Sequence, residues 1–159
     1  MKLPSHVAQR QATAAREKLR SGGESVVDIA IETYPPDQDP HFAPGSGITL
    51  IVKSSNGSVI GSDSIGERGK PAEQVGEEAA TKLLDEIKSN APVDRHLGDI
   101  LIPYLAVAEG RSEIFVSEVT MHTITNIEIA EIVVGVKFDL LGDLGKPGRI
   151  GVQGIGLRT

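Results

Sequence analysis

The sequence has no cysteine, and only 3% of its 159 residues are aromatic. The lack of cysteine excludes disulfides and thiolate metal sites and fits a reducing compartment, so we expect a cytoplasmic location. With so few rings, a hydrophobic core has to be built from Ile, Val, Leu and Ala, which favours aliphatic helices and β-branched strands. No apolar run approaches the roughly 20 residues that span a bilayer, so we expect no membrane partner.

An excess of positive charge is also lacking, because the formal net charge is −6. This value argues against a broad basic surface that binds long nucleic acid by neutralising phosphates. The 16 Lys and Arg residues still suffice for a small cationic pocket. Hydrophobic residues make up 39% and charged residues 24%, which is ordinary for a folded globular protein.

The first 45 residues predict a helix, a strand and a loop. Residues 5–20 form the helix, with Ser5 as its N-cap and Gly22-Gly23 as its end. Residues 26–34 alternate apolar and polar side chains, which is typical of a half-buried strand. The proline-rich stretch 35–44 predicts a loop.

A hairpin and the clearest helix of the chain follow. Residues 47–53 and 58–65 predict two strands, joined by a turn in which Asn56-Gly57 suits positive φ values. Residues 72–87 carry one continuous apolar stripe at helical spacing. We place a domain boundary near residue 90, which divides the chain into 1–90 and 91–159.

The second part predicts further helices and strands. Asp94 is the expected N-cap of a helix that runs through Leu105. Residues 113–119 predict a strand, residues 126–134 a short helix closed by Gly135, and residues 136–141 another strand. The glycine-rich remainder from Gly142 on predicts irregular structure, and the whole chain predicts an α/β mixture.

His122 is the first candidate for chemistry. It precedes Thr125-Asn126-Ile127-Glu128, which matches a capping box and puts His122 at a helix N-terminus. Backbone amides and the helix dipole at such an end can hold a phosphate, which a neutral imidazole can attack in line. The alternative is a histidine that ends a strand and fills a turn, and a lone histidine with no further information favours that alternative.

His96 and Asp99 form the second candidate, near the start of the preceding helix. Such a pair can orient a nucleotide, but an ordinary polar helix start is the simpler interpretation. Two residues are too few for a metal site, so we predict no metal ligands in this chain. The glycine turns at 44–47 and 66–70 lack the spacing of a Walker loop or a dinucleotide fingerprint and are interpreted as plain turns.

Five segments, taken in order and with their spacing, resemble the RNA 3′-terminal phosphate cyclase family. The most specific is the histidine in a Thr-x-His-x-x-Thr-Asn context that follows His-Leu-x-Asp. The segments are Pro44-Gly45-Ser46-Gly47-Ile48, Gly66-Glu67-Arg68-Gly69-Lys70, Glu73-Gln74-Val75-Gly76-Glu77-Glu78-Ala79, His96-Leu97-Gly98-Asp99 and Ser117-Glu118-Val119-Thr120-Met121-His122-Thr123-Ile124-Thr125-Asn126.

The resemblance implies an ATP-dependent ligase that converts an RNA 3′-phosphate end to a 2′,3′-cyclic phosphate through a histidine-AMP intermediate. His122 matches the nucleophile, and a divalent metal, Mg or Mn, assists at the phosphates. The residues that match the ATP-binding stretch are His96, Leu97, Gly98, Asp99 and Ile100. Ile100 departs from the family, which often has Gln there, because an isoleucine cannot hydrogen-bond the nucleotide.

The resemblance also implies the fold, an α/β arrangement of the α+β type. Residues 1–90 resemble the small inserted α/β domain of the family. Residues 91–159 resemble the last, partial βα-repeat unit of its catalytic domain, which has helices on one side of a sheet. Family members are much longer than this chain, so we expect the isolated chain to be inactive and to self-associate through its uncovered sheet edge and helix face.

A non-catalytic branch of the same family gives the alternative function. Its members resemble the cyclases but lack the histidine, and they serve as RNA-binding or ribosome-assembly modules. The presence of His122 favours the enzyme.

Overall fold

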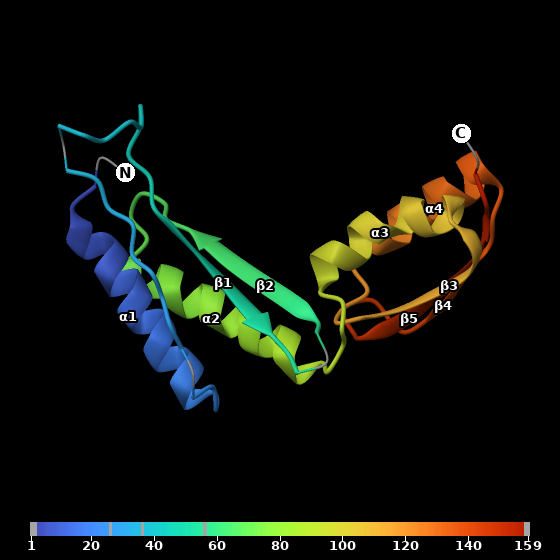
Figure 1. Ribbon diagram of the computed structural model, residues 1–159, viewed down its shortest axis with the longest axis horizontal. Coiled ribbons are helices and arrows are strands. Elements are labelled where there is room, and N and C mark those ends of the chain that lie inside the picture. Colours follow the sequence, from blue (N-terminus) through green and yellow to red (C-terminus); the bar gives the residue numbers. More distant parts are fainter. Residues whose placement is uncertain (1–2, 26, 36, 56, 158–159) are drawn as a thin grey trace. The chain divides into compact units, whose positions relative to one another are not determined.

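The computed structural model describes residues 3–25, 27–35, 37–55 and 57–157. Their helices and strands follow in the order α1 (Ser5–Ser21), β1 (Gly47–Lys53), β2 (Val59–Ile65), α2 (Ala72–Lys88), α3 (Arg95–Val107), β3 (Glu109–Val116), α4 (Met121–Val134), β4 (Phe138–Leu141) and β5 (Gly148–Ile155) (Figure 1). This mixture of helices and antiparallel strands confirms the predicted α/β class. Among the described helices, none has the length and apolar character needed to cross a membrane.

The chain divides into two compact units. One consists of Met1–Val52 and Gly61–Asp85, and the other of Lys53–Ile60 and Glu86–Thr159. The division assigned from the sequence, at residue 90, stays a prediction.

The first unit is held together by close contact between α1 and α2. A Cβ atom added at Gly76 of α2 would lie 2.1 Å from the carbonyl oxygen of Gln11 in α1, so glycine is required at this crossing. The part of the two-stranded sheet β1-β2 that belongs to this unit buries Ile48 and Leu50. The hydroxyl of Ser62 in β2 donates a 2.7 Å hydrogen bond to the Ala79 carbonyl of α2, which fixes the sheet on that helix.

Two sequence predictions in this unit are wrong. Residues 27–34 form no strand, because an alternating pattern becomes a strand only when a neighbour pairs with its backbone, and the sheet here contains β1 and β2 alone among the described residues. The N-cap of α1 is Pro4, whose extended backbone precedes the helix without a side-chain cap, and Ser5 is already helical. The predicted end at Gly22 is confirmed, since Gly22 is the C-cap.

The hairpin is confirmed in its main features. The turn closes with a 2.9 Å hydrogen bond from the Ser54 amide to the Ser58 carbonyl, and Gly57 has the expected positive φ of 91°. Asn56 lies outside the described residues, as do Val26 of the predicted strand and Pro36 of the predicted loop.

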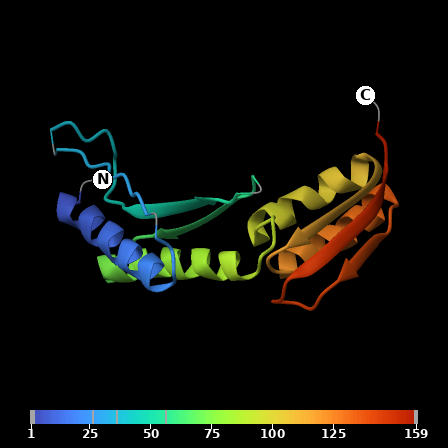
Figure 2. The ribbon, with the colours of Figure 1, turned by 60° about the horizontal axis from the view of Figure 1, so that its bottom comes forward.

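The second unit is a three-stranded antiparallel sheet with two helices on one face. The strand order is β3-β5-β4, so β5 is the central strand and pairs Ile150 with Ile114 on one side and with Leu140 on the other. Figure 2 shows α3 and α4 side by side against this sheet. The buried core residues are Ile102, Ala106, Val116, Val119, Ile127, Ala130, Val136, Ile150 and Val152.

The prediction of irregular structure from Gly142 on is wrong, because residues 148–155 form the central strand β5. Its glycines are there for close packing. A Cβ atom at Gly148 would lie 2.5 Å from Val119 Cγ2, and one at Gly154 would lie 2.2 Å from the Ala108 carbonyl oxygen at the end of α3. In this segment the glycines therefore mark positions where a neighbouring part of the chain packs closely, and they do not indicate irregular structure.

Other boundaries in the second unit differ from the predicted ones. The strand expected at 113–119 is Glu109–Val116, and the strand expected at 136–141 is Phe138–Leu141. The helix expected at 126–134 begins five residues earlier, at Met121. Its predicted end is confirmed, because Gly135 is the C-cap and has a left-handed backbone.

Candidate active site at the start of α4

Two threonines cap the N-terminus of α4. The Thr120 hydroxyl accepts a 3.0 Å hydrogen bond from the Thr123 amide, and the Thr123 hydroxyl accepts a 3.0 Å bond from the Thr120 amide. The capping box predicted at Thr125 and Glu128 is therefore wrong in position. A hydroxyl at the third helical residue takes the place of the glutamate that the usual pattern has there.

His122 is the second residue of α4, which confirms that it stands at a helix N-terminus. Its side chain is exposed, and within the described residues its imidazole has no hydrogen-bond partner. The amides of a first helical turn have no acceptor inside the helix, and the dipole makes that end positive. His122 thus lies at the positive end of α4, a position that in helices generally favours anions.

Asp99, in the second turn of α3, is bonded to the cap of α4. Its carboxylate oxygen Oδ1 accepts hydrogen bonds from the hydroxyls of Thr120 and Thr123, at 2.7 and 2.6 Å. Its backbone carbonyl accepts a 2.9 Å bond from the side-chain amide of Asn126. The N-terminal turns of α3 and α4 are thereby brought together, and His96 and His122 belong to those turns.

The other predicted nucleotide-binding residues divide between the two faces of α3. His96, Leu97 and Ile100 are exposed, and Ile100 has 59% of its surface accessible. Gly98 is buried, and a Cβ atom there would lie 2.7 Å from Val116 Cγ1 of β3. Asp94 caps this helix as predicted, accepting a 2.8 Å bond from the Leu97 amide. The binding roles of the five residues from His96 to Ile100 stay predictions.

Arg95 joins the start of α3 to the segment that leads into α4. Its guanidinium forms ion pairs with Glu86 at 2.5 Å and with Glu118 at 2.6 Å. Glu86 is only 3% exposed, so this pair lies in a poorly solvated place. Because two carboxylates neutralise Arg95, this cation is engaged in the fold and is not free to bind a phosphate.

Sequence reasoning missed the capping threonines, Asn126 and Arg95 as the residues that shape this end of the unit. The Thr-x-x-Thr pattern at the start of the helix, Thr120 to Thr123, was the available signal for the cap. No local signal pointed to Asn126 or Arg95, because their partners Asp99, Glu86 and Glu118 come from other elements.

The described residues contain no group of three His, Asp or Glu side chains that could hold a metal ion.

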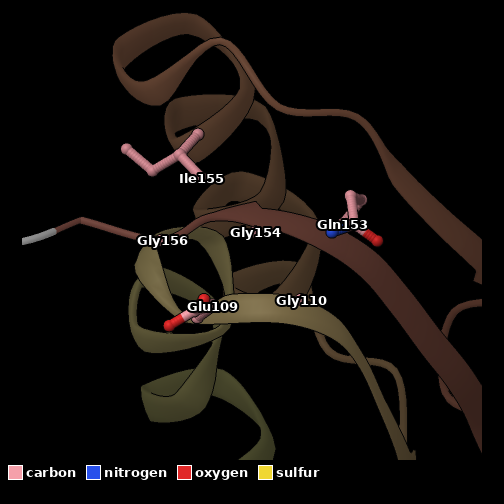
Figure 3. A pocket seen from close by; sticks show the side chains of 6 residues that line it. All are labelled: Glu109, Gly110, Gln153, Gly154, Ile155 and Gly156. Atoms are coloured by element: carbon pink, nitrogen blue, oxygen red, sulfur yellow. The ribbon is translucent and has the colours of Figure 1, made fainter.

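A shallow depression of about 350 Å³ lies elsewhere in the second unit (Figure 3). It is lined by the beginning of β3 and the end of β5, where Glu109 pairs with Ile155 and Gly110 with Gly154. The chain enters α4 from the other end of β3, after Val116. This depression contains none of the predicted site residues.

Comparison with known proteins gives concordant matches. A family model described as "RNA 3'-terminal phosphate cyclase (RTC), insert domain" matches residues 1–88. A protein named RNA 3'-terminal phosphate cyclase from Desulfurococcus amylolyticus is 50% identical over 159 residues, covering 99% of this chain and 44% of the relative. Proteins of the same name from Staphylothermus marinus and Pyrobaculum aerophilum are 46% and 49% identical, covering 99% and 97% of this chain and 44% and 42% of themselves. The chain thus spans less than half the length of these curated relatives.

Proposed function

Because the chain belongs to the RNA 3′-terminal phosphate cyclase family, we propose that it supplies the nucleophilic histidine of an ATP-dependent enzyme that cyclises RNA 3′-phosphate ends. The observation that supports this most is the exposed imidazole of His122 in the first turn of α4, beside amides that have no acceptor within the helix.

The proposed chemistry has three displacements at phosphorus. A ring nitrogen of His122 attacks the α-phosphorus of ATP, a phosphorus–nitrogen bond forms, and pyrophosphate leaves. An oxygen of the RNA 3′-phosphate then attacks the same phosphorus and frees the histidine. Finally the neighbouring 2′-hydroxyl attacks the activated 3′-phosphate, AMP leaves, and a 2′,3′-cyclic phosphate remains.

The first turns of α3 and α4 are the parts of this chain that would face the nucleotide. The positive ends of their dipoles favour a phosphate group there. The exposed side chains of His96, Leu97 and Ile100 lie on the same helix as Asp99 and offer mainly apolar surface, which suits a base better than a phosphate.

A divalent metal would depend on partners outside the described residues. These residues hold no cluster of three potential ligands. Mg²⁺ is commonly bound by one or two carboxylates together with substrate phosphates, so the nucleotide itself would provide much of its coordination.

We further propose that the isolated chain is inactive and self-associates. It spans only 44% of the Desulfurococcus relative, and Arg95, the cation closest in sequence to His96, is held by two glutamates. Both α3 and α4 carry exposed large apolar side chains, and a large exposed apolar patch usually marks an interaction surface. The exposed residues are Leu97, Ile100, Tyr104, Met121, Ile129, Ile132 and Val133.

The test is transfer of label from α-labelled ATP to protein in the presence of Mg²⁺ or Mn²⁺. It would use this chain alone and a chimera in which the chain replaces the matching 44% of the Desulfurococcus amylolyticus relative. We expect the chimera to acquire label that is labile in acid and stable in base, as a phosphoramidate is, and we expect the chain alone to acquire none.

The structure offers a matched control for the nucleophile. His6 is exposed and is the second residue of α1, which is the helical position that His122 has in α4. We expect His122→Ala to abolish the label and His6→Ala to leave it unchanged. An unlabelled chimera, or label that survives His122→Ala, would contradict the cyclase proposal and favour a non-catalytic binding module.

A further inference from the structure

Three side chains from the N-cap and the first two turns of α4 converge on one residue of α3. Thr120 and Thr123 bond to the carboxylate of Asp99, and Asn126 bonds to its backbone carbonyl. We propose that Asp99 is a positioning residue, which holds the first turn of α4 so that His122 is presented in a fixed orientation. This inference rests on the proposed function, since it concerns the same histidine.

The Asp99 carboxylate is needed because the cap uses the two threonine hydroxyls only as acceptors and leaves their protons without a partner. In the cap, each threonine hydroxyl accepts a hydrogen bond from a backbone amide, so each still has a proton to donate. The two hydroxyl oxygens are 3.2 Å apart, and at most one could donate to the other. Asp99 Oδ1 accepts a hydrogen bond from both hydroxyls. Thr123 is fully buried, so without Asp99 its hydroxyl proton would have no acceptor or would have to bond to a group that takes part in the cap.

The second connection, through Asn126, depends on a proline. In an α-helix the carbonyl of residue 99 accepts from the amide of residue 103, but residue 103 is Pro and has no amide proton. The Asp99 carbonyl is therefore left without its helical donor, and the side-chain amide of Asn126 takes that place at 2.9 Å. Because of Pro103, the Asp99 carbonyl of α3 is available to the Asn126 side chain of α4.

This geometry differs from a direct role of Asp99 toward the nucleotide. Oδ1 is occupied by two short hydrogen bonds, and a neutral amide oxygen could also accept both of them, more weakly than the carboxylate does. The positioning role therefore needs an acceptor at this place and no charge, whereas contact with a metal ion would need the charge. Asp99→Asn separates the two, because it keeps an acceptor oxygen and removes the charge.

The first experiment needs no activity and uses the chain itself. Amide hydrogen exchange, followed by NMR, would report on Thr123 and Ile124, whose amides bond to Thr120. We expect Asp99→Ala and Thr123→Val to speed exchange of these amides about tenfold, the size of a lost cap, and Asp99→Asn to speed it much less. Asp94→Ala is the matched control, because it removes the cap of α3 and should leave the Thr123 and Ile124 amides unchanged.

The role of Pro103 is tested in the same experiment. In Pro103→Ala the new amide can bond to the Asp99 carbonyl, so Asn126→Ala should have less effect on exchange in that background than in the unaltered chain. Unchanged exchange at Thr123 and Ile124 in Asp99→Ala would overturn the positioning role, and so would equal effects of Asp99→Asn and Asp99→Ala.

The second experiment measures adenylylation of His122 in the chimera with the Desulfurococcus relative. We expect Asp99→Ala to lower the rate of adduct formation by tenfold or more, with little change in the KM for ATP. Asp99→Asn should retain most of the rate. The double variant Asp99→Ala/Thr123→Val should be no slower than the slower of the two single variants. A raised KM with unchanged rate, or no recovery in Asp99→Asn, would assign Asp99 to direct ligand contact instead. If the unaltered chimera forms no adduct, the proposed function fails, while the exchange experiment still decides whether Asp99 holds the turn.

Discussion

Replacing Gly98 by Ala should destabilise the second unit through a clash with Val116, although the same change usually stabilises a helix. The added Cβ atom would lie 2.7 Å from Val116 Cγ1 and 3.3 Å from Val116 Cβ, whereas carbon atoms normally approach to about 3.5 to 4.0 Å. Overpacking of this kind costs about 1 to 3 kcal/mol. Alanine in place of glycine inside a helix returns about 1 kcal/mol. The expected net loss is therefore about 0 to 2 kcal/mol.

The cause can be isolated with a second substitution. Val116→Ala alone opens a small cavity beside β3, but it also removes the atom that clashes, so in Gly98→Ala/Val116→Ala the helical gain should reappear. We expect the double variant to be more stable than the sum of the single effects predicts, by about 1 to 3 kcal/mol. Urea unfolding followed by circular dichroism gives the free energies, and hydrogen exchange of α3 amides assigns them to the second unit. Strict additivity, or a stabilising Gly98→Ala, would refute the packing explanation of this glycine.

Two further predictions concern the surface. The hydrogen bond from Arg10, at 2.5 Å, is the main cause that lowers the pKa of Glu73 from 4.5 to about 2, so the stabilisation that this pair adds is complete above pH 4.5 and is lost as the pH falls toward 2. Arg10→Ala should return the pKa of Glu73 toward 4.5 in an NMR titration, and an unchanged midpoint would mean that other groups hold the carboxylate. The second concerns the apolar outer face of α4, where Ile132 and Val133 are 83% and 76% exposed. Sedimentation velocity should show concentration-dependent association, and Ile132→Lys/Val133→Lys should reduce it. Leu157→Lys, at a position that is 64% exposed, is the control and should leave the association unchanged. A chain that stays monomeric at every concentration tested would contradict the proposed self-association.

Elements with strong local signals were predicted well from the sequence. The helix expected at 72–87 is α2, Ala72–Lys88, because its continuous apolar stripe matches a single buried face. The sequence also predicts the Asp94 cap, because the Asp94 side chain acts on an amide only three residues away. In both cases the decisive interaction lies within one element or its first turn, so the sequence alone carries the information.

Elements that depend on distant partners were predicted poorly. Residues 27–34 have the pattern of a strand but no strand that pairs with them among the described residues, and residues 148–155 have little strand propensity but form the centre of a sheet. The glycines of β5 lower its intrinsic preference, yet they let Val119 and the end of α3 approach. Whether a glycine means a loop or a close contact is decided by the residues that pack on it.

The candidate site shows the same division within a single motif. The sequence correctly predicts His122 at a helix start, but it predicts the cap at Thr125, whereas Thr120 and Thr123 form it. Thr125 and Glu128 match the usual pattern, whereas the observed cap departs from it and is bonded to Asp99, which lies more than twenty residues earlier and accepts from the two capping threonines. Pro103 extends this argument, because it has no amide proton for the Asp99 carbonyl, which the Asn126 side chain binds instead. If Asn126→Ala speeds amide exchange less in the Pro103→Ala background, the hydrogen bond between Asn126 and the Asp99 carbonyl accounts for the spacing between the motif that contains Asp99 and the motif that contains His122.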